Sequence, residues 1–376
     1  MIVAGEASGD MYGGRLASAI QELAPGTTLT GIGGDKMAQA GVKLQVHIRD
    51  LSVMGVWEVL RDVRRLRKIL QGARRSIRES RPDGLIIIDS YRFNIELAKE
   101  ASRLGIPVIY YVAPKLWVWG KSRIRHLRKY VDMILAIFPF EEEYFRSQGM
   151  PVTYVGSPLT EILEDQAASD LSFIEKRSGR SVISILPGSR TSEVRNLLPH
   201  FLEASELIAR ELEGDVSFYL PLSQTISRGL VEDMVQRAGV DVTIVDGRSR
   251  DVLRNSDVAL VASGTATLEA FLLGIPQVVA YRTSWLTYFL GKRIVKIRRF
   301  SLPNILAGRD VVEELLQDEV IPERLARAVL GLMKVDGEAR SDYLQAGQEV
   351  YESLRGGEAS RLAAEKTLEI ITGKAA

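Results

Sequence analysis

The stretch VISILPG, residues 182–188, is an apolar run that ends in a Pro-Gly pair, and it starts a second series of such runs. The first series comprises IVAG (2–5), LIIID (85–89), PVIYYVA (107–113), MILAIF (133–138) and VTYVG (152–156). The second continues with VSFYLPL (216–222), VTIVDG (242–247), VALVASG (258–264) and PQVVAYR (276–282). Most runs are apolar on both faces, as buried parallel strands are, and helical stretches lie between them. Two successive series of this kind predict two doubly wound α/β domains.

The boundary between the predicted domains falls after the first series. The segment PLTEILEDQAASDLSFIEKRSGR (158–180) is expected to hold the linker and the first helix of the second domain. We therefore assign residues 1–157 to an N-terminal domain, 158–345 to a C-terminal domain, and 346–376 to a C-terminal helix that packs back on the N-terminal domain. In such folds ligands bind outside the carboxyl ends of the strands, so we expect a cleft between the domains.

Composition excludes several classes of site. The chain of 376 residues has no cysteine, which rules out disulfides, thiolate metal sites and a cysteine nucleophile. Its three histidines, His47, His126 and His200, are far apart in sequence, so we expect no histidine-rich metal site. No apolar run reaches the roughly 18 residues of a membrane-spanning helix, and we expect no signal peptide.

The net charge of +1 hides two basic segments. Residues 61–81 carry nine Arg and Lys against two acidic residues, and residues 292–299 carry five and no acid. Such segments favour anionic partners: phosphates, nucleic acid or anionic lipid.

Two turns of the second series carry residues that suit phosphate. The turn LPGSRTSEV supplies a glycine for close backbone approach, a hydroxyl donor and a guanidinium fork, followed by a carboxylate: Gly188, Ser189, Arg190 and Glu193. The turn ASGTATLEA opens a helix whose free N–H groups form an anion site, with a carboxylate one turn on that can accept from ribose hydroxyls: Ser263, Gly264, Thr265, Ala266 and Glu269. The alternatives are a β-turn with a surface Arg for the first turn and a capped helix with a solvated Glu for the second. Two phosphate-competent turns in one domain favour the anion site.

Two nucleotide motifs are absent from the sequence. The stretch GIGGDKM (31–37) fails the dinucleotide fingerprint because Lys36 stands where the third glycine is needed. We expect only a tight turn there. No phosphate-binding loop of the G-x-x-x-x-G-K-[ST] type is present.

An ordered set of motifs resembles the lipid-A-disaccharide synthase family. The set is VAGEASGD, SVMGVWEVL, YYVAPKLWVWG, FPFEEEYF, LPGSRTSEV, ASGTATLEA and SLPNILAGRDVVEELLQ, from about residue 3 to about residue 320. The resemblance implies a GT-B glycosyltransferase of two Rossmann-like domains, with the donor in the C-terminal one. It implies transfer from UDP-2,3-diacylglucosamine to 2,3-diacylglucosamine 1-phosphate, which gives the β-1,6-linked disaccharide and UDP. It also implies work at the cytoplasmic face of the bacterial inner membrane, without a metal or other cofactor.

The resemblance carries over to single residues. The two glycine-rich turns become the UDP site, in which Arg190 and helix N–H groups stabilise the leaving pyrophosphate. Asn304 matches a donor-side polar position of the family, and a plain turn role after Pro303 is the alternative.

The family's catalytic base is the first Asp of D-x-P-D-F-N, and this chain reads DSYRFN. Asp89 holds the matching place at the end of an apolar strand, where a carboxylate is costly unless it is used or paired. A helix N-cap after the strand is the alternative role for Asp89, and we favour the base. Tyr91 and Arg92 depart from the motif. Arg92 either pairs with Asp89 or holds the acceptor phosphate, and Asn94 is expected on the acceptor side.

The opening turn, Gly5 to Asp10, ends the first strand on the predicted cleft. Glu6, Ser8 and Asp10 are therefore candidates to hold sugar hydroxyls, with a helix cap as the equal alternative for Asp10.

The sequence also predicts a hydrophobic and basic surface that contacts the membrane. The segment 51–70 joins apolar residues to an Arg-rich helix, and we expect acyl chains to contact the apolar set: Val53, Met54, Val56, Trp57 and Leu60. The alternative is an ordinary helix with one core face and one solvated face.

Other functions stay open at this point. Another UDP-sugar GT-B enzyme, such as a peptidoglycan-type transferase or a UDP-GlcNAc 2-epimerase, uses the same turns. A nucleic-acid binder would use the Arg-rich helix, but no recognition motif supports it. A sugar-nucleotide-binding protein without catalysis would explain the altered base motif. Partner chains and oligomeric state are not readable from the sequence.

Overall fold

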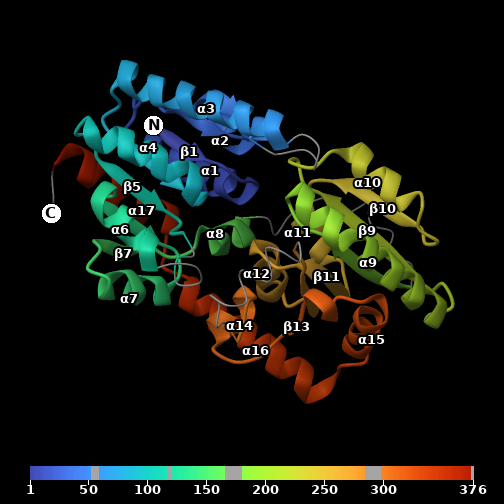
Figure 1. Cartoon of the computed structure of the whole chain (residues 1–376). Helices are drawn as coiled ribbons and strands as arrows, with labels where there is room; N and C mark the ends of the chain where they lie inside the picture. Colours follow the sequence, from blue (N-terminus) through green and yellow to red (C-terminus); the bar gives the residue numbers. More distant parts are fainter. Residues whose placement is uncertain (52–58, 115, 117–120, 166–179, 284–297, 374–376) are drawn as a thin grey trace. The chain divides into compact units, whose positions relative to one another are not determined.

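The computed structural model describes residues 1–51, 59–114, 116, 121–165, 180–283 and 298–373. The chain forms two compact units, each with its own sheet (Figure 1). Unit 1 comprises Met1–Glu164 and Ser353–Ala376, and unit 2 comprises Asp165–Glu352. None of the described helices is both long enough and apolar enough to cross a bilayer.

Unit 1 holds a seven-stranded parallel sheet in the order β3-β2-β1-β4-β5-β6-β7. The strands are β1 (Ile2–Ala4), β2 (Thr30–Gly33), β3 (Lys43–His47), β4 (Leu85–Ile88), β5 (Val108–Tyr111), β6 (Met133–Ala136) and β7 (Val152–Tyr154). The helices are α1 (Ala7–Leu23), α2 (Asp35–Gln39), α3 (Val59–Ser80), α4 (Tyr91–Arg103), α6 (Lys121–Tyr130), α7 (Pro139–Ser147), α8 (Pro158–Asp165) and α17 (Ala359–Thr372), with a short 3-10 turn at Ile48–Asp50. The strand order reverses between β1 and β4, and crevices form at such switch points.

Unit 2 holds a six-stranded parallel sheet in the order β10-β9-β8-β11-β12-β13. The strands are β8 (Ser181–Leu186), β9 (Val216–Leu222), β10 (Val242–Asp246), β11 (Val258–Ala262), β12 (Gln277–Tyr281) and β13 (Glu313–Leu316). The helices are α9 (Thr191–Glu211), α10 (Arg228–Val235), α11 (Ser249–Arg254), α12 (Thr265–Leu272), α14 (Leu302–Ala307), α15 (Pro322–Met333) and α16 (Gly337–Leu354), with a 3-10 turn at Gln317–Glu319. Here the order reverses between β8 and β11.

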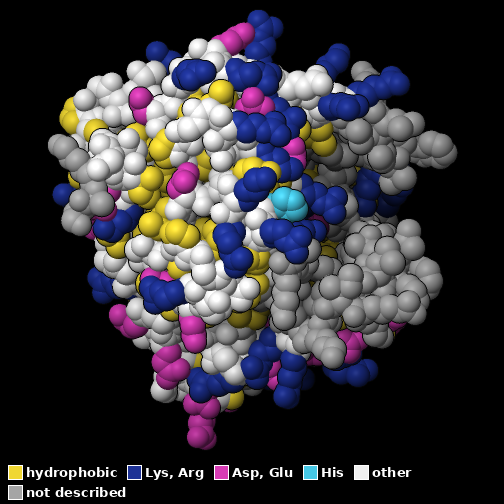
Figure 2. All heavy atoms as spheres, turned by 60° about the vertical axis from the view of Figure 1, so that its left-hand side comes forward, with side chains coloured by type: hydrophobic (Ala, Val, Ile, Leu, Met, Phe, Trp, Pro, Cys, Tyr) yellow, Lys and Arg dark blue, Asp and Glu magenta, His cyan; other side chains and the backbone are white. Residues whose placement is uncertain are grey.

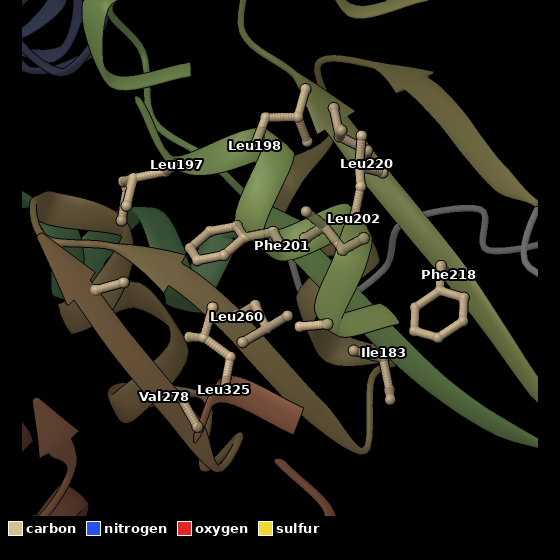
Figure 3. Close-up of a cluster of buried hydrophobic side chains, with 14 of the residues drawn as sticks. Ile183, Leu197, Leu198, Phe201, Leu202, Phe218, Leu220, Leu260, Val278 and Leu325 are labelled. Atoms are coloured by element: carbon tan, nitrogen blue, oxygen red, sulfur yellow. The ribbon is translucent and has the colours of Figure 1, made fainter. Parts of the chain in front are cut away.

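The core of unit 2 shows why the apolar runs become buried strands. Phe201 and Leu202 of α9 lie over the sheet, and side chains from several strands meet them (Figure 3). Ile183, Leu260 and Val278 come from three neighbouring strands and are fully buried. Removing this apolar area from water is the main term that stabilises the unit.

Three strands escaped the sequence prediction, namely β2, β3 and β13. β2 contains Gly31 and Gly33, residues that usually mark loops. The structure gives the reason for Gly31, because a Cβ there would overlap the carbonyl oxygen of Ile2 on β1. β3 and β13 are edge strands with several exposed or charged positions, so they lack a continuous apolar pattern.

The unit boundaries differ from the predicted ones by seven residues at each end. α8 lies within unit 1 rather than opening unit 2, because Leu159 and Ile162 are buried there. α17 packs against α1, and Glu161 of α8 accepts hydrogen bonds from the Ser360 backbone N–H and hydroxyl at 2.8 and 2.5 Å. Most of α16 belongs to unit 2, so the return to unit 1 begins at Ser353 rather than at residue 346.

Candidate active site

The first cluster of candidate residues lies at the switch point of unit 1. The turns after β1 and β4 touch there, because a Cβ at Gly5 would overlap the Ser90 side chain. Glycine at position 5 therefore lets the opening turn approach the turn that carries Asp89. Glu6 and Asp89, two of the three carboxylates predicted for this edge, follow neighbouring strands and are both half-buried.

Asp89 stands in a backbone conformation that non-glycine residues seldom adopt. Its φ is +49° and that of Ser90 is +36°, both in the left-handed region. A non-glycine residue pays about 1–2 kcal/mol for that conformation, so surrounding contacts must hold the turn. Val112, which follows the neighbouring strand β5, also has a positive φ, +59°, although it is β-branched.

Two buried side chains hold the Asp89 turn. Asn94 Nδ2 donates to the carbonyl oxygens of Ile88 and Asp89, at 2.9 Å each. The Tyr110 hydroxyl donates to the same Asp89 carbonyl oxygen. Asn94 and Tyr110 are completely buried. Asn94, predicted for the acceptor side, thus acts on the backbone beneath Asp89.

Tyr110 also reports the electrostatics of this cluster. Burial, followed by the negative charge of Asp89 and a smaller contribution from Glu6, raises its pKa well above the usual value. The phenol therefore keeps its proton and remains a donor to the Asp89 carbonyl. Tyr110 did not emerge from the sequence as a site residue, because a tyrosine in an apolar strand looks like ordinary core.

Asp10 has a structural task in this structure. Its carboxylate accepts from the backbone N–H groups of Gly34, Lys36 and Met37 at 2.6, 3.1 and 3.0 Å. It is 3% exposed, so little of it is left for a substrate. Of the two roles left open for Asp10, the geometry favours the helix cap, although the helix it caps is α2 rather than its own. Ser8 is half-buried in the first turn of α1.

The second cluster lies at the switch point of unit 2, beginning with the turn after β8. Glu193 Oε2 accepts from the backbone N–H groups of Ser189 and Arg190 at 3.1 and 3.3 Å. Gly188 has φ +115°, and a Cβ there would overlap the Glu193 carboxylate. Glu193 therefore shapes the turn from within, which is a different role from the predicted ligand contact.

Arg190 presents its guanidinium to solvent from this turn. The side chain is 57% exposed, and Nη1 lies 2.8 Å from Glu193 Oε1. Tyr281, at the end of β12, lies near the pair: burial raises its pKa, the charge of Glu193 raises it further and that of Arg190 opposes the rise. Tyr281 is a second residue that sequence analysis missed.

The turn after β11 forms the other half of this cluster. Gly264 caps α12, and the Thr267 hydroxyl donates back to the Gly264 carbonyl oxygen at 2.7 Å. Ser263, Thr265 and Ala266 are partly exposed at the start of the helix, as an anion site requires.

Glu269 is buried rather than solvated in this helix. Burial raises the pKa of its carboxyl group, and Arg250 of α11, 3.7 Å away, opposes the rise. Arg250 is a partner that the sequence did not reveal, since it lies on a different helix.

Both polar atoms of the Asn304 side-chain amide form hydrogen bonds within the protein. Its Oδ1 accepts from the N–H groups of Val311 and Val312 at 2.7 and 2.9 Å. Its Nδ2 donates to the Val312 carbonyl oxygen and to Glu314 at 3.0 and 2.9 Å. The side chain is 2% exposed. The structure thus shows a loop-holding role, and its donor role stays a prediction.

The predicted acyl-contact residues fall largely outside the described part of the chain. Val53, Met54, Val56 and Trp57 lie outside the described residues, and of Leu60 only the helical backbone in α3 is described. Further along α3, Ala73 and Ile77 are core residues, while Arg64, Arg67 and Lys68 are exposed. This part of α3 therefore has one core face and one solvated basic face.

Nearly the whole chain resembles one family of known proteins. The sequence model of the family described as lipid-A-disaccharide synthetase matches residues 1–370. The lipid-A-disaccharide synthase of Myxococcus xanthus is 40% identical over 373 residues, covering 99% of this chain and 97% of the relative.

Solved structures show a shared fold at low identity. The structure of UDP-GlcNAc 2-epimerase from Neisseria meningitidis bound to UDP-GlcNAc has a TM-score of 0.66 at 16% identity, with 98% of each chain covered. The calicheamicin glycosyltransferase CalG4 has a TM-score of 0.59 at 16% identity, covering 100% of this chain and 99% of that one. These likenesses confirm the predicted GT-B fold. The family match and the 40% identity to the Myxococcus xanthus relative show that the chain belongs to the lipid-A-disaccharide synthase family, whose members are glycosyltransferases of lipid A biosynthesis.

Proposed function

We propose that the chain transfers the sugar of UDP-2,3-diacylglucosamine to the 6-hydroxyl of 2,3-diacylglucosamine 1-phosphate, with inversion at the donor carbon. One observation carries the proposal: the candidate residues lie on turns at the switch point of each sheet. Unit 1 has a carboxylate there, and unit 2 has a guanidinium after β8 and a helix N-terminus after the neighbouring strand β11. This is the division of labour that a base and a leaving diphosphate require.

Asp89 acts as the base in this proposal. It takes the proton of the acceptor hydroxyl as that oxygen attacks carbon 1 of the donor sugar, and the bond from carbon 1 to the UDP oxygen breaks. Asn94 and Tyr110 hold the Asp89 backbone, so the carboxylate is aimed by buried donors rather than by a flexible turn. Glu6 and Ser8 are assigned to the acceptor side of the same edge.

UDP binds in unit 2 in this proposal. Arg190 and the first N–H groups of α12 receive the charge that develops on the leaving diphosphate, which lowers the barrier without a proton transfer to UDP. Gly188, Ser189, Gly264, Thr265 and Ala266 supply backbone and hydroxyl contacts, and Glu269 is assigned to the ribose. Glu193 contributes by holding the Arg190 turn.

The enzyme is proposed to act at the cytoplasmic face of the inner membrane, bound to anionic lipid. The support is the basic face of α3, where Arg64, Arg67 and Lys68 are exposed and form no ion pair within the described part of the chain. Each cation near a charged leaflet contributes about 1 kcal/mol, and salt screens it. Binding to vesicles should therefore need anionic lipid and fall with added salt.

The proposal is tested with purified protein in detergent micelles. UDP-2,3-diacylglucosamine and 2,3-diacylglucosamine 1-phosphate should give UDP and a β-1,6 disaccharide 1-phosphate, whereas UDP-GlcNAc as donor should give neither. No product from the acylated pair, or epimerisation of UDP-GlcNAc at carbon 2, would refute it.

A further inference from the structure

A groove of about 330 Å³ lies along α4 and α6 in unit 1, beyond the Asp89 turn. Its volume is at the small end of the range for ligand sites, about 300–1,000 Å³. Arg92 and Lys99 line it from α4, and Arg123 and His126 line it from α6. Figure 2, which faces the side of the molecule seen at the left of Figure 1, shows Lys and Arg side chains gathered near a histidine.

The groove carries an excess of positive charge. Three of its lining residues are Arg or Lys and only one, Glu96, is a carboxylate, which leaves two positive charges before His126 is considered. Glu96 is already engaged, because it accepts from Lys99 at 2.5 Å and from Arg74 of α3. The hydrogen bond from Lys99 is the main reason that its pKa is lowered, so it stays ionised.

The remaining cations have no carboxylate of their own. Within the described residues neither Arg92 nor His126 forms an ion pair, and the pair between Arg92 and Asp89 that the sequence left open is not formed. Arg123 lies over the Tyr91 ring, 5.3 Å from its centroid. Burial raises the pKa of Tyr91, so the ring stays a neutral platform that fixes the guanidinium.

The position of the groove links it to the candidate base. Arg92 lies in the first turn of α4, three residues after Asp89, and Lys99 lies two turns further on. At 1.5 Å per residue, the cations on α4 span about 10 Å from the strand end outward. A ligand whose anionic end lies in the groove can therefore place another part of itself near Asp89.

We propose that this groove binds the phosphate monoester of the sugar acceptor, and so selects acceptors that carry a phosphate. A monoester has about 1.5–2 negative charges at pH 7, which matches the surplus of two cations, and arginine forks bind its oxygens in pairs. The assignment rests on the proposed function for the identity of the acceptor. The same chemistry would also suit phospholipid headgroups, and the experiment separates the two sources.

The test is a direct binding measurement that needs no turnover. Calorimetry in detergent micelles compares 2,3-diacylglucosamine 1-phosphate with 2,3-diacylglucosamine for the parent and for Arg92→Gln and Arg123→Gln. The matched controls are Arg103→Gln on α4 and Arg125→Gln on α6, because both side chains are exposed and neither lines the groove. Sedimentation with phosphatidylcholine vesicles containing phosphatidylglycerol measures headgroup binding.

The parent should prefer the phosphorylated acceptor, and each groove variant should lose about ten-fold of that preference, as expected for one charged hydrogen-bond partner. The controls should keep the preference, and vesicle binding should be unchanged in all variants. A preference retained in the groove variants would overturn the inference, as would a loss of vesicle binding with the preference intact. If the parent shows the preference but no transfer, the proposed function fails while the groove assignment stands.

Discussion

The Asp89 turn of unit 1 and the Arg190 turn of unit 2 each follow a central strand that flanks a switch point, β4 in unit 1 and β8 in unit 2, yet they are built differently. In unit 2 the left-handed position is taken by Gly188, with φ +115°, and the carboxylate of Glu193 closes the turn. In unit 1 Asp89 and Ser90 take left-handed positions without glycine, and Asn94 and Tyr110 hold them. Unit 1 therefore keeps non-glycine side chains in a strained backbone conformation, which is typical of functional sites. In unit 2 glycine takes the left-handed position without strain, and the turn presents one exposed cation, Arg190.

The largest effect is expected at Asp89. Asp89→Asn should lower turnover by about a hundred- to ten-thousand-fold, the range for a lost general base. Because UDP is assigned to unit 2, calorimetry should find UDP affinity unchanged. Steady-state assays of UDP release measure the loss.

Asp89→Gly sharpens the contrast between the turns. Glycine removes the left-handed cost but adds freedom to the unfolded chain, so the free energy of unfolding should hold or rise by up to about 1 kcal/mol while turnover is lost. A clear loss of stability in urea titrations would show that Asp89 is kept for structure instead.

Arg190→Ala should weaken UDP binding at the unit 2 turn while the backbone of the turn keeps its conformation. Glu193 still accepts from the two backbone N–H groups, so the turn persists, while one charged hydrogen-bond partner of the diphosphate is removed. UDP affinity should fall by about ten- to a hundred-fold, with a parallel fall in turnover. Arg195→Ala, an exposed arginine on the same helix, is the control and should bind UDP as the parent does.

Tyr110→Phe tests whether the hydrogen bond from the buried Tyr110 hydroxyl stabilises the left-handed backbone at Asp89. The Asp89 carbonyl oxygen keeps Asn94 but loses the phenol, so the unfolding free energy should fall by about 1 kcal/mol. Turnover should fall by about ten-fold through misplacement of the carboxylate, with little change in the KM for donor. Reduced stability with unchanged turnover would mean that the hydrogen bond from Tyr110 stabilises the fold but does not position the Asp89 carboxylate.

The smallest effect is a pH dependence at Glu269. Its pKa is raised by burial above the ordinary 4.5, so the folded state holds the proton more strongly than the unfolded chain. That stabilisation is complete below pH 4.5 and is lost as the pH rises through the folded pKa. The Glu269→Gln variant has no proton to lose at this position, so its Tm relative to the parent should increase from pH 4 toward pH 7. A difference in Tm that is independent of pH would contradict the raised pKa of Glu269.

The sequence was most informative where one physical rule dominates. The apolar runs predicted both domains and ten of the strands, because burial on both faces leaves a continuous signal. β2 was missed because glycine at position 31 is required by the close approach of β1. A contact between strands distant in sequence leaves no local pattern that would mark the glycine as part of a strand.

The roles of polar residues were harder to predict than their location. Glu193 and Asn304 both accept hydrogen bonds from backbone N–H groups. The same residue types serve this role and the predicted donor contact, so the sequence does not distinguish the two, and the donor contacts stay predictions. Arg250 and Tyr110 act through residues far away in sequence, so nothing local identifies them.

The contrast between the two turns is tested most directly by measuring UDP affinity and turnover together on Asp89→Asn and Arg190→Ala. The account predicts a crossed result: Asp89→Asn binds UDP as the parent does and hardly turns over, whereas Arg190→Ala loses both. Turnover at the parental rate in Asp89→Asn, or equal weakening of UDP binding by the two substitutions, would contradict the assignment of the base to unit 1 and the diphosphate to unit 2.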